Sequence, residues 1–246
     1  MSKGVLSSMY IGIMTGSSLD GIDVVLVDFV SKPAGELVQM QQYPYPEDLK
    51  QQVHSLSEGK TNRDAIDLYA QCDIALGQCC AHVVKQFLSS LGQDATGVRA
   101  IGLHGQTIRH QPNAALPYTL QLGSAAVLAT ETGIDVVYDF RAKDVALGGQ
   151  GAPLAPLYHQ ALLGMVSEPV ALLNIGGIAN LTYIKPTDSG MAIRGTDTGP
   201  GNALMDVWCQ QHRGCAYDAQ GDWAASGRVI PALLAKLLSD PLVSGV

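Results

Sequence analysis

The sequence predicts an α/β protein in which one architectural unit is started twice. Three observations carry this prediction. The 246 residues include 27 glycines, more than average usage gives, and these cluster in turns between apolar runs. The apolar runs alternate between strand-like lengths and helical spacing. The order of elements that opens the chain also returns after its midpoint, which indicates an internal duplication.

The first half reads as three strands followed by helix, strand, helix and strand. The expected strands are short apolar runs set off by turn residues, at residues 10–14, 22–29, 36–43, 99–104 and 134–138. Apolar residues recur at helical spacing from Ile66 to Phe87, and a shorter helix is expected at residues 124–132. The order β-β-β-α-β-α-β is that of ribonuclease-H-like domains.

The second half repeats the opening. A helix is expected to begin near Pro153, because proline suits a first helical position. Strands at 170–175, 178–184 and 191–194 and a helix at 203–212 follow, and after a last helix at 228–238 the chain stops at Val246. We therefore expect two ribonuclease-H-like domains, residues 1–150 and residues 151–246, the second incomplete, with a ligand cleft between them. The half-built sheet indicates either a truncated chain or another chain that covers its open edge.

Composition excludes several functional classes. The formal charge is −7 with no cluster of lysine and arginine, so no nucleic-acid partner is expected. No apolar run approaches the ~18 residues of a membrane helix, and the first residues do not resemble a signal peptide. The five cysteines are odd in number and contain no C-x-x-C pair, which favours reduced cytoplasmic thiols over disulfides or a zinc site.

The most specific stretch is MTGSSLDGID, residues 14–23. Gly16 and Gly21 permit a tight strand-turn-strand whose backbone N–H groups face outward and suit phosphate oxygens. Neighbouring hydroxyls add donors: Thr15, Ser17 and Ser18. Asp20 or Asp23 could hold Mg²⁺ through water. The alternative is a hairpin whose serine and aspartate side chains merely satisfy the turn.

Two further stretches lie in the second half. LNIGGIANLT, residues 173–182, places Gly176 and Gly177 at the position of the first hairpin, although two-glycine turns are also common without function. GTDTGPGN, residues 195–202, leads from a strand into a helix that Asn202 could cap. Asp197 in this stretch is a candidate general base toward a bound hydroxyl or water, or else a turn-forming aspartate.

Two polar islands, HGQT at residues 104–107 and DFR at residues 139–141, end buried strands. Open α/β sheets place ligand contacts at strand carboxyl ends. His104 and Arg141 could therefore bind a hydroxyl and a carboxylate of a substrate; the alternatives are a structural histidine and a structural Asp139–Arg141 pair.

These motifs together resemble one family. MTGSSLDGID, LHGQT, DFR, KDVALGGQGAPL, LNIGGIANLT and DTGPGNALMD occur in the order found in the anhydro-N-acetylmuramic acid kinases. The similarity runs from Tyr10 to the last residues. Members of this family are similar in fold to the acetate kinase, hexokinase, Hsp70 and actin group, the actin-like ATPases.

The resemblance implies a reaction of cell-wall recycling and amino-sugar catabolism in the cytoplasm. ATP and water would convert 1,6-anhydro-N-acetylmuramic acid to N-acetylmuramic acid 6-phosphate and ADP, with Mg²⁺. Asp197 matches the family's catalytic base. The implied phosphate contacts are Gly16, Ser17, Ser18, Leu19, Asp20, Gly21, Ile22 and Asp23, with Gly176 and Gly177. The implied sugar contacts are His104, Arg141, Asn174 and Thr198. A homodimer is also implied.

The resemblance also leaves alternatives. The family chain continues through a glycine-rich segment that holds adenosine, so we expect this chain to bind ATP weakly and to turn over poorly. The alternatives are a non-catalytic sugar-binding remnant, a related kinase with another small substrate, or a structural fragment without a ligand.

Overall fold

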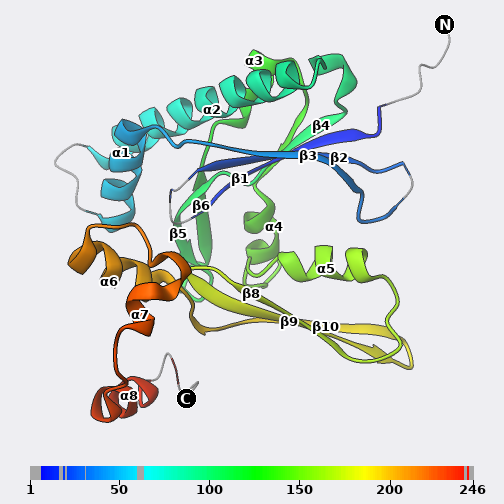
Figure 1. Ribbon diagram of the computed structural model, residues 1–246. Helices are drawn as coiled ribbons and strands as arrows, with labels where there is room; N and C mark the ends of the chain where they lie inside the picture. The colour runs from blue at the N-terminus through cyan, green and yellow to red at the C-terminus, as the bar shows by residue number, and fades with distance from the viewer. Residues whose placement is uncertain are drawn as a thin grey trace, which may run out of the picture. The chain divides into compact units, whose positions relative to one another are not determined.

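The computed structural model describes residues 7–16, 19, 21–30, 32–59, 64–240 and 243. The chain divides into two compact units, Met1–Ala152 and Pro153–Val246. The division falls two residues after the boundary expected from the sequence. Figure 1 gives the labels of the helices and strands.

The first unit contains a five-stranded sheet in the order β3-β2-β1-β4-β7. Its strands are β1 (Met9–Thr15), β2 (Ile22–Asp28), β3 (Glu36–Tyr43), β4 (Ala100–Leu103) and β7 (Val136–Tyr138). The pairs β1–β2 and β2–β3 are antiparallel, whereas β4 runs parallel to β1 and β7 parallel to β4. This is the ribonuclease-H-like arrangement, so the expected fold class is confirmed for this unit.

Helices cover the sheet and close a core. They are α1 (Glu47–Glu58), α2 (Ala65–Ser90) and α3 (Ala125–Thr132), with a short 3₁₀ turn η1 (Ala95–Gly97), and Figure 1 shows α2 and α3 along one face of the sheet. The helix α2 begins where the Asp64 carboxylate accepts a hydrogen bond from the Ile66 N–H at 2.8 Å. Its buried side chains recur every three or four residues, which is why this long segment is helical: Leu68, Cys72, Leu76, Cys80, Val84 and Phe87. They share one core with the buried strand residues Ile11, Ile13, Ile22, Val24 and Leu26.

Besides η1, four elements of this unit were not expected from the sequence. These are α1, the hairpin strands β5 (Gln106–Gln111) and β6 (Tyr118–Leu122), and α4 (Phe140–Ala146). The hairpin begins three residues after β4. Asp139 has a φ of 58°, and this left-handed residue turns the chain from β7 directly into α4.

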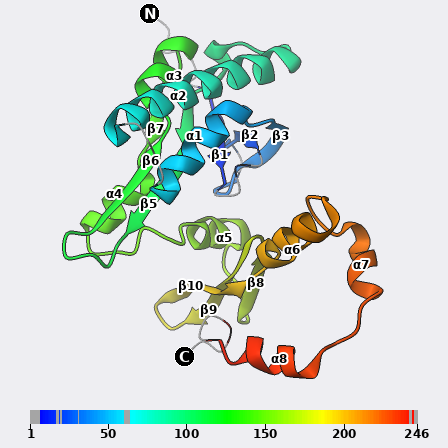
Figure 2. The same ribbon diagram turned by 90° about the vertical axis from the view of Figure 1, so that its left-hand side faces the viewer.

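The second unit contains an antiparallel sheet of β8 (Val170–Ile175), β9 (Ile178–Thr187) and β10 (Gly190–Pro200), in the order β10-β9-β8. The helix α5 (Ala155–Leu163) covers one face of it, as Figure 2 shows. A Cβ on Gly195 of β10 would lie 2.6 Å from Pro153 and from Pro156, so this glycine allows the close approach. The helix α6 (Ala203–Arg213) follows β10, so this unit repeats the β-β-β-α opening of the first.

The remaining elements of the second unit are short: η2 (Ala219–Gly221), α7 (Asp222–Ala225) and α8 (Pro231–Leu238). Over the described residues, every helix of the chain is too short or too polar to cross a membrane.

Candidate active site

The carboxyl ends of the parallel strands in the first unit meet at one edge of the sheet. Ile13 of β1 lies opposite Leu103 of β4, and Leu103 lies opposite Tyr138 of β7. The His104 N–H donates to the Ile13 carbonyl at 3.1 Å. The start of the first hairpin, the HGQT stretch and the DFR stretch therefore lie together, as expected for strand ends of an open α/β sheet.

His104 and Arg141 are bonded to one another at this edge. The Arg141 Nε–H donates to His104 Nε2 at 3.0 Å, and His104 Nδ1 lies 2.6 Å from the Gly105 carbonyl. Since Nε2 accepts, the ring proton sits on Nδ1 and is donated to that carbonyl. Both ring nitrogens of His104 thus have protein partners, and the imidazole orients the guanidinium.

The electrostatics agree with this tautomer. Burial, followed by the Arg141 charge, lowers the pKa of His104, while the Gly105 carbonyl opposes the shift. Burial also lowers the pKa of Arg141, which nevertheless stays a cation at neutral pH. A neutral imidazole beside a guanidinium keeps the positive charge on Arg141, where an anionic group could bind.

The loop after α4 completes the support of Arg141. The Arg141 Nη1–H donates to the Gly151 carbonyl at 2.6 Å, and the Gly151 N–H donates to Asp144 Oδ2 at 2.7 Å. The Gly149 N–H donates to the Asp144 carbonyl at 2.8 Å, and a Cβ on Gly149 would collide with the Asp144 carboxylate. The glycines of the GGQG stretch therefore fold the loop back onto α4.

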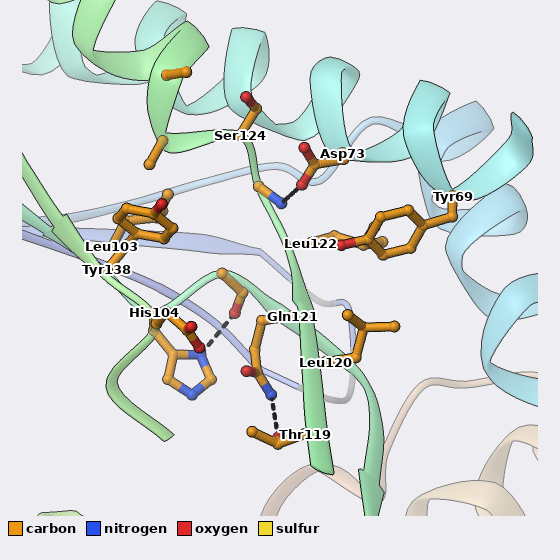
Figure 3. Close-up of a pocket in the computed structure, with 15 residues that line it drawn as sticks. Tyr69, Asp73, Leu103, His104, Thr119, Leu120, Gln121, Leu122, Ser124 and Tyr138 are labelled. Carbon is orange, nitrogen blue, oxygen red and sulfur yellow. Dashed lines mark hydrogen bonds between the residues drawn. The ribbon is translucent and has the colours of Figure 1, made fainter. Parts of the chain in front are cut away.

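A cavity of about 310 Å³ opens beside His104 (Figure 3). Its polar lining includes Tyr69 and Asp73 of α2 and Gln121 of β6. The Asp73 carboxylate accepts from the Gly123 N–H at 2.8 Å, and the Asp73 backbone carbonyl accepts from the Ser124 N–H.

Burial raises the pKa of Asp73, although the hydrogen bond from Gly123 opposes that shift. The pKa of Tyr69 is raised first by burial and then by the charges of Asp73 and Asp139. These cavity residues were missed from the sequence. The available signal was an aspartate immediately beside the buried stripe of α2, directly after Cys72.

The first hairpin is described in part: Ser17, Ser18 and Asp20 lie outside the described residues, whereas Gly16, Leu19 and the segment 21–23 lie within them. The Leu19 N–H donates to the Gly16 carbonyl at 3.1 Å, and Leu19 has a φ of 53°. Its side chain is only 6% exposed, so it anchors the turn in the core.

Of the two aspartates predicted to hold Mg²⁺, Asp23 lies within the described residues. Its carboxylate accepts from Gln42 Nε2 at 3.0 Å. Within the described part of the chain, no three side chains of histidine, cysteine, aspartate or glutamate gather as metal ligands. Magnesium through Asp23 or Asp20 stays a prediction.

The second unit aligns three polar residues across its sheet. Asn180 of β9 lies opposite Asn174 of β8 on one side and opposite Asp197 of β10 on the other. Direct cross-strand partners share a face, so these residues form one row. Asp197 is exposed, and the register shifts between Asp197 and Gly199. The Thr198 hydroxyl donates to the Ala179 carbonyl at 3.1 Å, so it already has a backbone partner.

The Gly176–Gly177 turn is packed against the loop that enters α6. The Asn202 N–H donates to the Gly176 carbonyl and the Gly201 N–H to the Gly177 carbonyl, both at 2.9 Å. A Cβ on Gly201 would lie 2.0 Å from the Gly176 carbonyl oxygen. Asn202 occupies the N-cap position of α6 but makes no side-chain cap hydrogen bond, so the expected capping is wrong. Its backbone is bound to the glycine turn instead.

The fold and these strand-end residues define an α/β protein of the ribonuclease-H-like class. The family model described as Anhydro-N-acetylmuramic acid kinase matches residues 8–245, and the chain belongs to that family. It is 47% identical over 234 residues to the anhydro-N-acetylmuramic acid kinase of Vibrio vulnificus (strain YJ016), covering 95% of this chain and 61% of the relative. It is 48% identical over 237 residues to that of Xanthomonas axonopodis pv. citri (strain 306), covering 96% and 62%.

The chain thus spans about three fifths of the length of these curated relatives. Among solved structures, it is similar to a ROK family protein from Streptococcus pneumoniae TIGR4 in complex with sucrose, at 12% identity and a TM-score of 0.34, covering 89% of this chain and 68% of that one.

Proposed function

We propose that this chain carries the catalytic base and the sugar-binding residues of an ATP-dependent kinase. The kinase opens 1,6-anhydro-N-acetylmuramic acid with water and phosphorylates its 6-oxygen. The products are N-acetylmuramic acid 6-phosphate and ADP. The observation that carries the proposal is the Asp197 carboxylate, exposed in a polar row beside a glycine turn, in a chain of this family.

Asp197 is the general base of the proposed reaction. Its carboxylate takes a proton from water as the water oxygen attacks the anomeric carbon. The bond from that carbon to the bridging 6-oxygen breaks, and the freed oxygen attacks the γ-phosphorus of ATP, from which ADP leaves. Asn174 and Asn180, in the same row, offer amide groups that can orient the sugar or the water.

The first hairpin is the proposed phosphate grip, with the segment 16–23 and the Gly176–Gly177 turn as contacts. One structural observation, separate from the sequence motif, supports phosphate binding by this hairpin. The Thr15 side chain is 2% exposed, and its hydroxyl has no hydrogen-bond partner among the described residues. Such a hydroxyl at the mouth of a glycine hairpin can donate to a phosphate oxygen. Mg²⁺, held through Asp20 or Asp23, would neutralise phosphate charge.

Arg141 is the proposed contact of the sugar's carboxylate. Its guanidinium is half-buried and oriented by His104 and by the Gly151 carbonyl. A pre-oriented guanidinium binds a carboxylate at a lower cost in side-chain entropy. His104 is then a positioning residue, and Thr198 stays a proposed contact of the sugar. Cytoplasmic location and a homodimer remain part of the proposal.

The test is mass spectrometry of products after incubation of the purified chain with ATP, Mg²⁺ and the anhydro sugar. We expect the 6-phosphate to form slowly and Asp197→Asn to lower its rate by about 10²–10⁴-fold, the contribution of one general base. Asp188→Asn is the matched control, because Asp188 is an exposed aspartate at the opposite end of the β9–β10 pair.

Other outcomes distinguish the alternatives. Sugar binding without product would support a non-catalytic remnant. Product from another small substrate in preference to the anhydro sugar would support a related kinase. Equal rates for the wild type and Asp197→Asn would remove Asp197 from the mechanism.

A further inference from the structure

Buried polar side chains in the described residues differ in whether they are satisfied. Thr15, Gln106 and Thr182 are each 2% exposed. The Thr182 hydroxyl bonds His159 Nδ1 at 2.8 Å, whereas Gln106 Oε1, like the Thr15 hydroxyl, has no partner among the described residues. Buried polar groups are nearly always paired in native proteins, so an unpaired amide oxygen requires an explanation.

Gln106 lies at the sheet edge where the candidate site is built. It follows β4 by three residues, and β4 is paired with β1, which ends at Thr15. The turn before it is fixed by Gly105, which has a φ of 74° and no room for a Cβ, because that atom would lie 2.3 Å from the Leu122 carbonyl oxygen.

The cavity beside His104 adjoins this position through the neighbours of Gln106, which is not itself a lining residue. His104 and Gly105, the two residues before Gln106, line it, and so does Leu122, the residue opposite Gln106 in the β5–β6 register. An unsatisfied acceptor at this place lowers the stability of the ligand-free protein. A ligand that donates the missing hydrogen bond would remove this cost.

We propose that Gln106 is a specificity-determining residue whose side-chain carbonyl accepts a hydrogen bond from a neutral donor of the sugar. The inference rests on the proposed function and adds a contact to it. A phosphate oxygen is excluded as the partner of Oε1 itself, because two acceptors repel one another and a phosphate offers no proton at neutral pH. The anhydro sugar offers two neutral donors, its one free ring hydroxyl and its acetamido N–H.

The test separates ligand binding from stability with two variants of the full chain. Gln106→Met removes the carboxamide at nearly constant shape. Tyr45→Phe is the matched control: the Tyr45 hydroxyl is also buried and unpartnered in the described part of the chain, but Tyr45 follows β3, which two strands separate from β4 in the sheet. Thermal unfolding without ligand should give both variants a melting temperature equal to or above that of the wild type.

Calorimetric titration with the anhydro sugar should then distinguish the two variants. We expect Gln106→Met to weaken binding about tenfold, the loss of one hydrogen bond, and Tyr45→Phe to leave it unchanged. The analogue without the ring hydroxyl and the analogue without the acetamido group identify the donor. The analogue that lacks the donor bound by Gln106 should bind the wild type more weakly than the intact sugar does. Gln106→Met should bind that analogue and the intact sugar equally well.

Three results would overturn the inference. If the wild type binds the sugar and Gln106→Met binds it equally well, Gln106 is not a contact while the proposed function stands. If Gln106→Met melts well below the wild type, the amide is satisfied within the protein. If the wild type does not bind the sugar at all, the proposed function fails and this contact fails with it.

Discussion

His104 shows how a single side chain couples the candidate site to pH. Its neutral ring donates from Nδ1 to the Gly105 carbonyl and accepts the Arg141 Nε–H at Nε2. Protonation would place a second donor against the guanidinium. The pair is therefore compatible with one protonation state of His104, and burial lowers the pKa of the ring accordingly.

This lowered pKa predicts the direction of a pH effect on stability. The unfolded chain has the ordinary histidine pKa of 6.5, so it binds a proton at a higher pH than the folded chain does. The free energy of unfolding should fall as the pH drops below about 7, until the lower folded pKa is passed. His104→Asn keeps a donor for the Gly105 carbonyl but cannot take the proton, so its loss of stability between about pH 7 and pH 5 should be smaller.

The measurement is urea unfolding at a series of pH values. His82→Asn is the control for a histidine-to-asparagine change at an exposed position of α2. Parallel curves for the wild type and His104→Asn would contradict the role assigned to this pair.

At the scale of elements, patterns confined to one segment predicted the most. β3 and β8 span the expected residues. In contrast, β5 and β6 pair only with each other, in a separate two-stranded sheet. The polar segment Gln106–Gln111 shows no clear alternation of apolar and polar residues that would indicate a strand. The helix α1 was not predicted, because only three of its twelve residues are buried and its apolar pattern is short.

The candidate site was predictable in its location but not in its contacts. Polar islands after predicted strands indicated the sheet edge where His104 lies. The expectation that the strand before Asp139 is buried was wrong, because Val137 and Tyr138 of β7 are exposed. That His104 would use both ring nitrogens on protein atoms depends on α4, whose start is set by the left-handed Asp139. The place of Asp73 in the cavity lining and its hydrogen bond from the Gly123 N–H depend on how α2 packs against β6. No local sequence pattern predicts that packing.

The contact between the glycine turn and the α6 entry loop gives an element-scale prediction. A Cβ at Gly201 would lie 2.0 Å from a backbone oxygen, which cannot rotate away as a side chain could. Gly201→Ala should therefore displace the loop and lower the free energy of unfolding by about 1–3 kcal/mol. It should also lower the proposed activity, because Asp197 precedes this loop.

Denaturant unfolding and the product assay measure the two effects. Gly97→Ala is the matched control, because nothing lies within 4 Å of its added Cβ and no positive φ is involved. That control should change stability by less than about 0.5 kcal/mol. An equally stable and equally active Gly201→Ala would show that the loop does not hold the position inferred from the turn.

Across the whole molecule, burial is divided very unequally between the two units. Every member of the main hydrophobic core belongs to the first unit. Among the described residues of the second unit, the buried hydrophobic side chains are Ile184 and Cys209. Many large apolar side chains of that unit are exposed, including Leu173, Ile175, Ile178, Leu204, Met205, Val207 and Trp208. A unit that buries little apolar surface has little free energy to oppose local opening.

Native-state hydrogen exchange should therefore find two levels of protection in the isolated chain. We expect the amides of β8 and β10 to exchange through openings of lower free energy than those of β1, β2 and β4, because the latter strands lie against the continuous core. Within the second unit, the slowest amides should be those near Thr182 and Ile184, the buried residues of β9, which is the middle strand and contacts α5. Adding the anhydro sugar should slow exchange around His104 and Arg141 if these residues bind it. Uniform protection across both sheets would instead mean that the two units unfold as one cooperative body, and that stabilisation of the second unit does not come from its own buried side chains.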